Sequence, residues 1–102
     1  MNIPAPKATS TEQERQQRLT ELTAEQGDEK LDQYKPGSFG CHELLDRTAL
    51  VGDMVEENVL SHPACVQNPE WYALAEQAVA ALRELYQRVG AEHLGDTAAK
   101  GG

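Results

Sequence analysis

Aromatic, basic and cysteine residues are all scarce in this sequence, and each shortage excludes a class of protein. The 102 residues include one tryptophan, three tyrosines and one phenylalanine, so any core is mostly aliphatic, and the chain forms at most one small domain. Nine Lys and Arg residues against seventeen Asp and Glu residues give a net charge of −8. Nonspecific nucleic-acid binding is therefore not expected, because neutralising phosphates needs a basic surface.

Long apolar runs are missing as well. No run approaches the roughly 18 residues that a membrane-spanning helix needs, and the first residues carry no charged-then-apolar secretory leader. We therefore expect a cytoplasmic protein with no membrane partner.

The two cysteines, Cys41 and Cys65, are expected to be reduced and to act as small apolar side chains. Segments 41–42 and 62–65 each place a histidine near a cysteine, but structural zinc takes two ligands from each of two tight knuckles. The helices expected below would also separate the two segments by roughly 30 Å. We expect no metal and no cofactor.

The first third of the chain has a weak helical signal. Residues 1–9 carry two prolines and no periodicity, which predicts a mobile tail. From Ser10 to Gln26 the residues favour a helix, but Leu19 and Leu22 are its only large apolar residues, and so narrow a stripe anchors a helix weakly. We expect this helix to dock loosely or to become ordered on a partner.

Local signals set the expected ends of that helix. Thr11 and Glu14 have the spacing of a capping box, and Gly27 is the residue type that ends a helix in left-handed geometry. Residues 27–32 are expected to form a charged linker.

Strong periodicity begins after a turn-rich loop, residues 34–40. Apolar and small residues then recur at steps of three and four, which predicts an amphipathic helix from about Phe39 to Leu60. Pro63 stops it, because proline disfavours helical geometry in the residue before it. The stripe consists of Cys41, Leu44, Leu45, Thr48, Val51, Val55, Asn58 and Val59.

A second amphipathic helix is predicted to begin at segment 68–70. Asn68 is a capping residue, Pro69 suits the first helical position, and Glu70 is an acid in the first turn. Gly90 occupies the place of a left-handed C-cap, and residues 94–102 are expected to be a flexible tail. The stripe consists of Trp71, Leu74, Ala75, Ala78, Val79, Leu82, Leu85, Tyr86 and Val89.

Two helices of about 22 residues joined by a short loop predict an all-α fold. We expect an antiparallel helical hairpin over residues 34–93, preceded by the weaker N-terminal segment 1–33. Trp71 and Tyr72 are expected to cover the tip of the hairpin. A hairpin of this size cannot cover both of its stripes, so we expect a homo-oligomeric bundle.

The loop before the first long helix has side chains suited to a phosphate with an attached base. Lys35 supplies a cation, Ser38 a hydroxyl, and Tyr34 and Phe39 offer stacking faces, while the helix N-terminus offers unpaired N–H groups. The simpler interpretation is that the loop is only a turn and that Ser38 caps the helix.

The hairpin is expected to bring more side chains to the base of this loop. Arg47 is expected near Arg83, and His42, Glu43 and His93 are expected at the same end. Because no nucleophile motif accompanies them, we predict no catalytic residue. The predicted ligand-binding set is Tyr34, Lys35, Ser38, Phe39, His42, Arg47, Arg83 and Tyr86.

Segment 34–36 (Tyr-Lys-Pro), the long polar-faced helix, segment 69–71 (Pro-Glu-Trp) and the alanine-rich stretch 73–86 resemble the helical-hairpin anti-defence proteins of phages. Those proteins sequester the cyclic-nucleotide signals of the CBASS and Thoeris systems without cleaving them. The resemblance implies a small oligomeric sponge in the bacterial cytosol, encoded by either a phage or its host. It also implies that Tyr34 stacks on a base and that Lys35 meets a phosphate.

The sequence therefore predicts a non-enzymatic homo-oligomer that sequesters a phosphate-bearing nucleotide. The alternative is a helical protein-interaction module with no small ligand, which the acidic composition and the polar segment 10–26 favour. A third hypothesis is a small hydrolase or lyase that uses His42 and Glu43 near Tyr86.

Overall fold

The computed structural model describes the backbone of residues 7–101 and the side chains of residues 10–95. Every regular element within this range is helical, which confirms the all-α prediction. No helix in the described range is both long and apolar enough to cross a membrane. The chain divides into two compact units, one ending at Gln33 and the other beginning at Tyr34.

Helix α1 (Lys7–Gln26) is the main element of the first unit and has no buried side chain among its described residues. Ion pairs along its surface support it, including Arg15 with Glu12 at 2.6 Å. The hydrogen bond from Arg15, helped by one from Gln16, holds the pKa of the Glu12 carboxyl well below its usual value. Of the predicted N-terminal tail, residues 1–6 lie outside the described residues.

The C-terminal end of α1 lies where the sequence predicts it, whereas the N-terminal end does not. Gly27 follows the last helical residue with φ +89°, so the predicted stop is confirmed. The predicted capping box is wrong: the helix begins at Lys7, which places Thr11 inside it. Residues 27–32 are not a linker either, because α2 (Asp28–Leu31) and the 3-10 helix η1 (Asp32–Tyr34) follow at once. Asp28 and Glu29 in the first turn of α2 favour this short helix electrostatically.

A tight turn leads into α3 (Phe39–Val55). The Ser38 N–H donates to the Lys35 carbonyl at 3.0 Å, with Pro36 second and Gly37 third in the turn. Gly37 has φ +88°, the conformation that a type II turn requires at this position. The Ser38 hydroxyl accepts from the Cys41 N–H at 3.1 Å and caps the helix.

The predicted helix 39–60 is confirmed in extent but not in regularity. After α3 the chain continues as one π-helical segment, η2 (Glu56–Leu60), in which the Ser61 N–H donates to the Glu56 carbonyl at 3.0 Å. A single turn, α4 (Pro63–Val66), follows, and the His62 ring caps it by accepting from the Ala64 N–H.

Helix α5 (Pro69–Gly101) starts as the sequence predicts and ends later. The Asn68 side chain accepts from the N–H groups of Glu70 and Trp71, both at 3.1 Å. The predicted C-cap at Gly90 is wrong, because the helix continues through it to Gly101. Gly90 does not have the positive φ that a left-handed cap needs. The contact that holds the continued helix is made by His93 and is described below.

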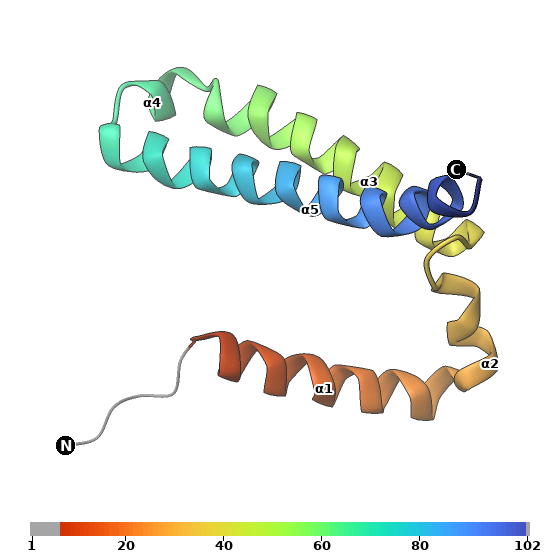
Figure 1. Cartoon of the computed structure of the whole chain (residues 1–102). Helices are drawn as coiled ribbons and strands as arrows, with labels where there is room; N and C mark the ends of the chain where they lie inside the picture. Colours follow the sequence, from red (N-terminus) through yellow and green to blue (C-terminus); the bar gives the residue numbers. More distant parts are fainter. Residues whose placement is uncertain (1–6, 102) are drawn as a thin grey trace. The chain divides into compact units, whose positions relative to one another are not determined.

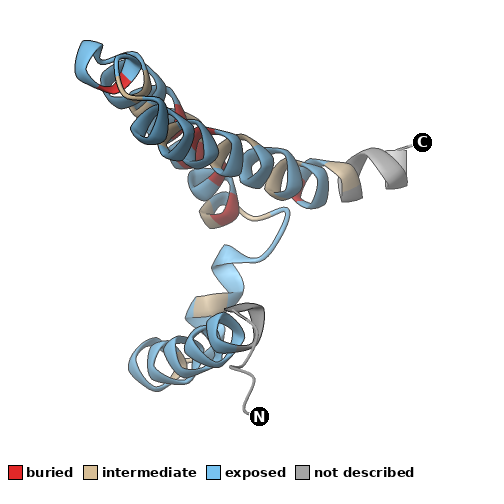
Figure 2. Cartoon of the chain, turned by 90° about the vertical axis from the view of Figure 1, so that its left-hand side faces the viewer, coloured by how far each residue is buried: buried red, intermediate tan, exposed pale blue. Residues whose placement is uncertain are grey.

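Helices α3 and α5 lie side by side (Figure 1). Leu45 lies against Gly90, and the Arg83 guanidinium lies against Gly52. Buried residues follow the seam between these helices (Figure 2). They are few and mostly small, and no large side chain in the described range is completely buried. On the three helices of this unit they are Cys41, Leu45, Thr48, Gly52, Cys65, Val79 and His93.

Two Gly→Ala substitutions should change stability in opposite directions. Gly37→Ala forces a β-carbon into left-handed geometry, which costs about 1–2 kcal/mol. Gly90→Ala adds a methyl group in ordinary contact with Leu45, at 3.7 Å, and should stabilise helix α5 by roughly 0.5–1 kcal/mol. Thermal unfolding followed by circular dichroism measures both. A lower melting temperature for Gly90→Ala would restore the C-cap interpretation.

Candidate functional site

The loop residues predicted to hold a nucleotide do not form an enclosed site. The Ser38 hydroxyl is used as the helix cap, as the simpler interpretation expected. Phe39 is 92% exposed, and Tyr34 and Lys35 are exposed as well.

Arg47 and Arg83, which were expected near each other, each pair with carboxylates. Arg83 lies against Gly52, and its guanidinium donates to Asp53 at 2.9 Å and to Glu56 at 2.6 Å. Arg47 pairs instead with Glu43 on its own helix, at 3.2 Å.

The structure does join histidines at the base of the helix pair. The Gly37 N–H donates to Nδ1 of His93 at 2.8 Å, and Nε2 of His93 lies 3.3 Å from Nδ1 of His42. His93 is 6% exposed, whereas the His42 side chain is half exposed and its Nε2 faces Asp46 at 3.7 Å. This chain of contacts ties the loop before α3 to the last turns of α5.

The backbone donor fixes where each ring proton lies. Since Gly37 offers only an N–H, Nδ1 of His93 must be an acceptor, so a neutral His93 carries its proton on Nε2. That proton points to Nδ1 of His42, which must accept it. A neutral His42 then carries its own proton on Nε2, toward the Asp46 carboxylate.

This arrangement argues against His42 as a general base. Both of its ring nitrogens are engaged: Nδ1 accepts from His93, and the Nε2 proton faces Asp46. A general base needs a free lone pair within reach of a substrate proton. Among the described residues, moreover, no three His, Cys, Asp or Glu side chains are grouped to hold a metal ion.

His93 was the residue that sequence reasoning placed with least precision. Its position continues the stripe of α5, because it lies four residues after Val89 and seven after Tyr86. Ending the helix at Gly90 hid this continuation.

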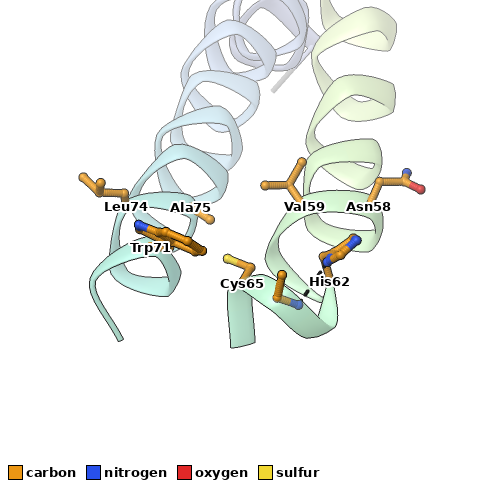
Figure 3. Close-up of a pocket in the computed structure, with 8 residues that line it drawn as sticks. Asn58, Val59, His62, Cys65, Trp71, Leu74 and Ala75 are labelled. Atoms are coloured by element: carbon orange, nitrogen blue, oxygen red, sulfur yellow. Dashed lines mark hydrogen bonds between the residues drawn. The ribbon is translucent and has the colours of Figure 1, made fainter. Parts of the chain in front are cut away.

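An open hollow lies at the end of the helix pair opposite to the histidines. We call it the tip hollow; it has a volume of about 600 Å³ and lies between η2, α4 and α5 (Figure 3). Its polar members are satisfied internally, since Asn58 donates to the Met54 carbonyl and the His62 ring accepts from the Ala64 N–H. The hollow is lined by Asn58, Val59, His62, Ala64, Cys65, Trp71, Leu74 and Ala75.

Trp71 therefore has a different role from the expected one. It was predicted to cover the tip together with Tyr72, but it is 55% exposed and forms one wall of the open tip hollow. Figure 3 shows Cys65 between Trp71 on α5 and His62 on the opposite side. Cys65 is buried and fills the turn that the aromatic side chains were expected to close. Both cysteines are free thiols.

A smaller hollow, the base hollow, has a volume of about 220 Å³ at the opposite end of the pair. It is lined by Pro36, Cys41, Leu44, Arg88, Val89 and Glu92. Arg88 already pairs with Glu84 at 2.7 Å. The hollow therefore presents an apolar floor with a compensated charge at its edge.

Comparison with protein-family models, curated proteins and solved structures finds no match to this chain.

The ring tautomers of the two histidines are a direct test of the base geometry. We expect neutral His93 and neutral His42 both to carry the proton on Nε2. Long-range proton–nitrogen NMR spectra distinguish the two nitrogens of each ring by their chemical shifts. A proton on Nδ1 of His93 would contradict the hydrogen bond from Gly37.

Removing the two histidines that accept backbone N–H groups should have unequal effects. His93→Ala leaves the Gly37 N–H without its buried partner and should cost about 2 kcal/mol or more. His62→Ala is the matched control: its ring also accepts from a backbone N–H, but at an exposed site where water can replace it. We expect the control to cost less than about 1 kcal/mol in chemical denaturation. Equal costs would show that His93 is not an anchor.

Proposed function

We propose that this chain is a protein-interaction module built on an antiparallel helical hairpin, α3 with α5, and that it assembles with helices of another chain. One observation carries the proposal: the apolar stripes of the hairpin are only partly covered within the chain. Large apolar side chains on both helices stay 44–60% exposed, whereas the seam buries mostly small residues. Those that belong to the predicted stripes are Leu44, Val51, Val59, Trp71, Leu74 and Leu85.

Charge supports an apolar partner over a phosphate-bearing one. All five arginines of the sequence pair with carboxylates: Arg15, Arg18, Arg47, Arg83 and Arg88. Arg83 is held by two acids at once. A phosphate would have to displace these carboxylates and approach a chain of net charge −8. Nucleotide sequestration therefore has less support than the interaction module.

The two candidate functions differ in a thermal-shift panel. We expect no rise in melting temperature with cyclic di- and trinucleotides, cyclic ADP-ribose isomers, NAD or ADP-ribose at about 1 mM. A ligand with a Kd of about 10 µM would add roughly 2.7 kcal/mol at that concentration, which is a shift of about 10 °C or more for a domain of this size.

Lys35→Ala is the control for that panel, because Lys35 is the exposed cation of the predicted nucleotide loop. A large shift with any nucleotide that disappears in Lys35→Ala would contradict the interaction module and support sequestration. Ligand recovered in altered form would instead support an enzyme.

A further inference from the structure

A subset of the exposed apolar side chains of the hairpin forms one face, whereas others, such as Leu50, lie off it. On α3 and η2, Leu44, Val51, Val55 and Asn58 follow one another at steps of seven, four and three residues. On α5, the corresponding stripe consists of Trp71, Leu74, Ala78, Leu85, Val89 and Glu92. The two hollows show that these stripes share a side of the hairpin. Residues of both stripes line the tip hollow, and residues of both stripes line the base hollow.

The ion pairs that cross between the two helices lie on the opposite side of the seam. Asp53 is two residues after Val51, which places it about 200° around the helix from that face residue. Arg83 is two residues before Leu85 and so lies on the corresponding far side of α5. Arg83 crosses the seam to Asp53 there. The apolar face carries no acid between Leu44 and Asn58 on its α3 side. On its α5 side none occurs until Glu92, at the rim of the base hollow.

We propose that this apolar face binds the same face of a second copy of the chain, which closes a four-helix bundle; the inference rests on the proposed interaction function. Two antiparallel helix pairs packed face to face are a standard way to complete such a core. The α3 stripe from Leu44 to Asn58 is about 21 Å long at 1.5 Å per residue. With two helices 8–10 Å apart, the face covers roughly 500 Å².

That area is large enough for a specific dimer. Two such faces bury about 1,000 Å² together, which reaches the size at which specific interfaces begin. A single apolar patch of roughly 500 Å² is also near the upper end of what a soluble monomer exposes. Helix α1 lacks the side chains to cover it, since its only large apolar residues are Leu19 and Leu22.

The absence of acids from the face favours a second copy over a different partner. With a net charge of −8, two copies of the chain repel each other wherever their acidic surfaces meet. A basic partner would be attracted to the side that carries the acids. A face without acids is the one at which two equally acidic chains can approach.

Light scattering coupled to size-exclusion chromatography tests the proposal on the full chain at about 100 µM. We expect twice the 11.2 kDa mass of one chain for the unmodified protein and the mass of one chain for Leu74→Glu. Leu50→Glu is the matched control, because Leu50 is 59% exposed, close to the 60% of Leu74, but lies off the face. This control should keep the doubled mass. Both variants should keep their helical circular dichroism, since neither side chain is buried.

Three results would overturn the proposal: the mass of one chain for the unmodified protein, a doubled mass for Leu74→Glu, or equal dissociation in both variants. A different measurement would contradict the proposed interaction function itself. A nucleotide-dependent thermal shift contradicts it whatever the mass. A chain that stays monomeric and shows no such shift contradicts only the second copy as partner.

Discussion

The contact between α3 and α5 buries only a narrow strip of each helix, and the exposure of their larger apolar side chains follows from that limit. Its buried residues include Gly52, Cys41 and Thr48, which are small. Small residues let two helices approach closely, but they remove little apolar surface from water, at about 25 cal/mol per Å². The larger side chains of the same stripes are therefore left at the edges of the seam, where they remain partly exposed.

With so little hydrophobic burial, the base of the hairpin relies on a polar contact. His93 accepts the Gly37 N–H and so joins the turn before α3 to α5. A buried N–H without a partner would cost free energy, and the imidazole satisfies it while filling space. The same bond sets the ring tautomers of His93 and His42, because a backbone N–H can only donate. One hydrogen bond thus positions the loop and leaves His42 without a free lone pair.

The sequence predicted the features that local chemistry determines. Ser38 and Asn68 cap their helices as their residue types suggest, and Gly27 ends α1 with a positive φ. The prediction of a C-cap at Gly90 was wrong because glycine can either end a helix or lie within one. The contact of His93 with the distant Gly37 favours the continued helix, and local sequence does not reveal that contact.

The position of side chains across the helix pair is a feature that local chemistry does not determine. Arg47 and Arg83 were expected near each other because the sequence analysis assumed which residues of the two helices lie opposite one another. In the structure, Arg83 lies opposite Gly52. Asp53 and Glu56 pair with its guanidinium there. A shift of a few residues in helix pairing changes which charges meet, and periodicity alone does not determine that shift. The residues of each apolar stripe, by contrast, could be predicted from helical periodicity. The small number of buried apolar residues could be predicted from the composition.

The acidic composition and the apolar face are compatible in a bundle of two copies. Face-to-face packing would place the charged sides of the two hairpins on the outside, separated by two helix layers, or roughly 20 Å. The Debye length at physiological ionic strength is about 8 Å, so most of the repulsion between those outer surfaces is screened. Repulsion would act at short range only if acids lay in the interface, and the stripes from Leu44 to Asn58 and from Trp71 to Leu85 contain none. The distribution of charge would therefore allow the proposed assembly at this face without a basic partner.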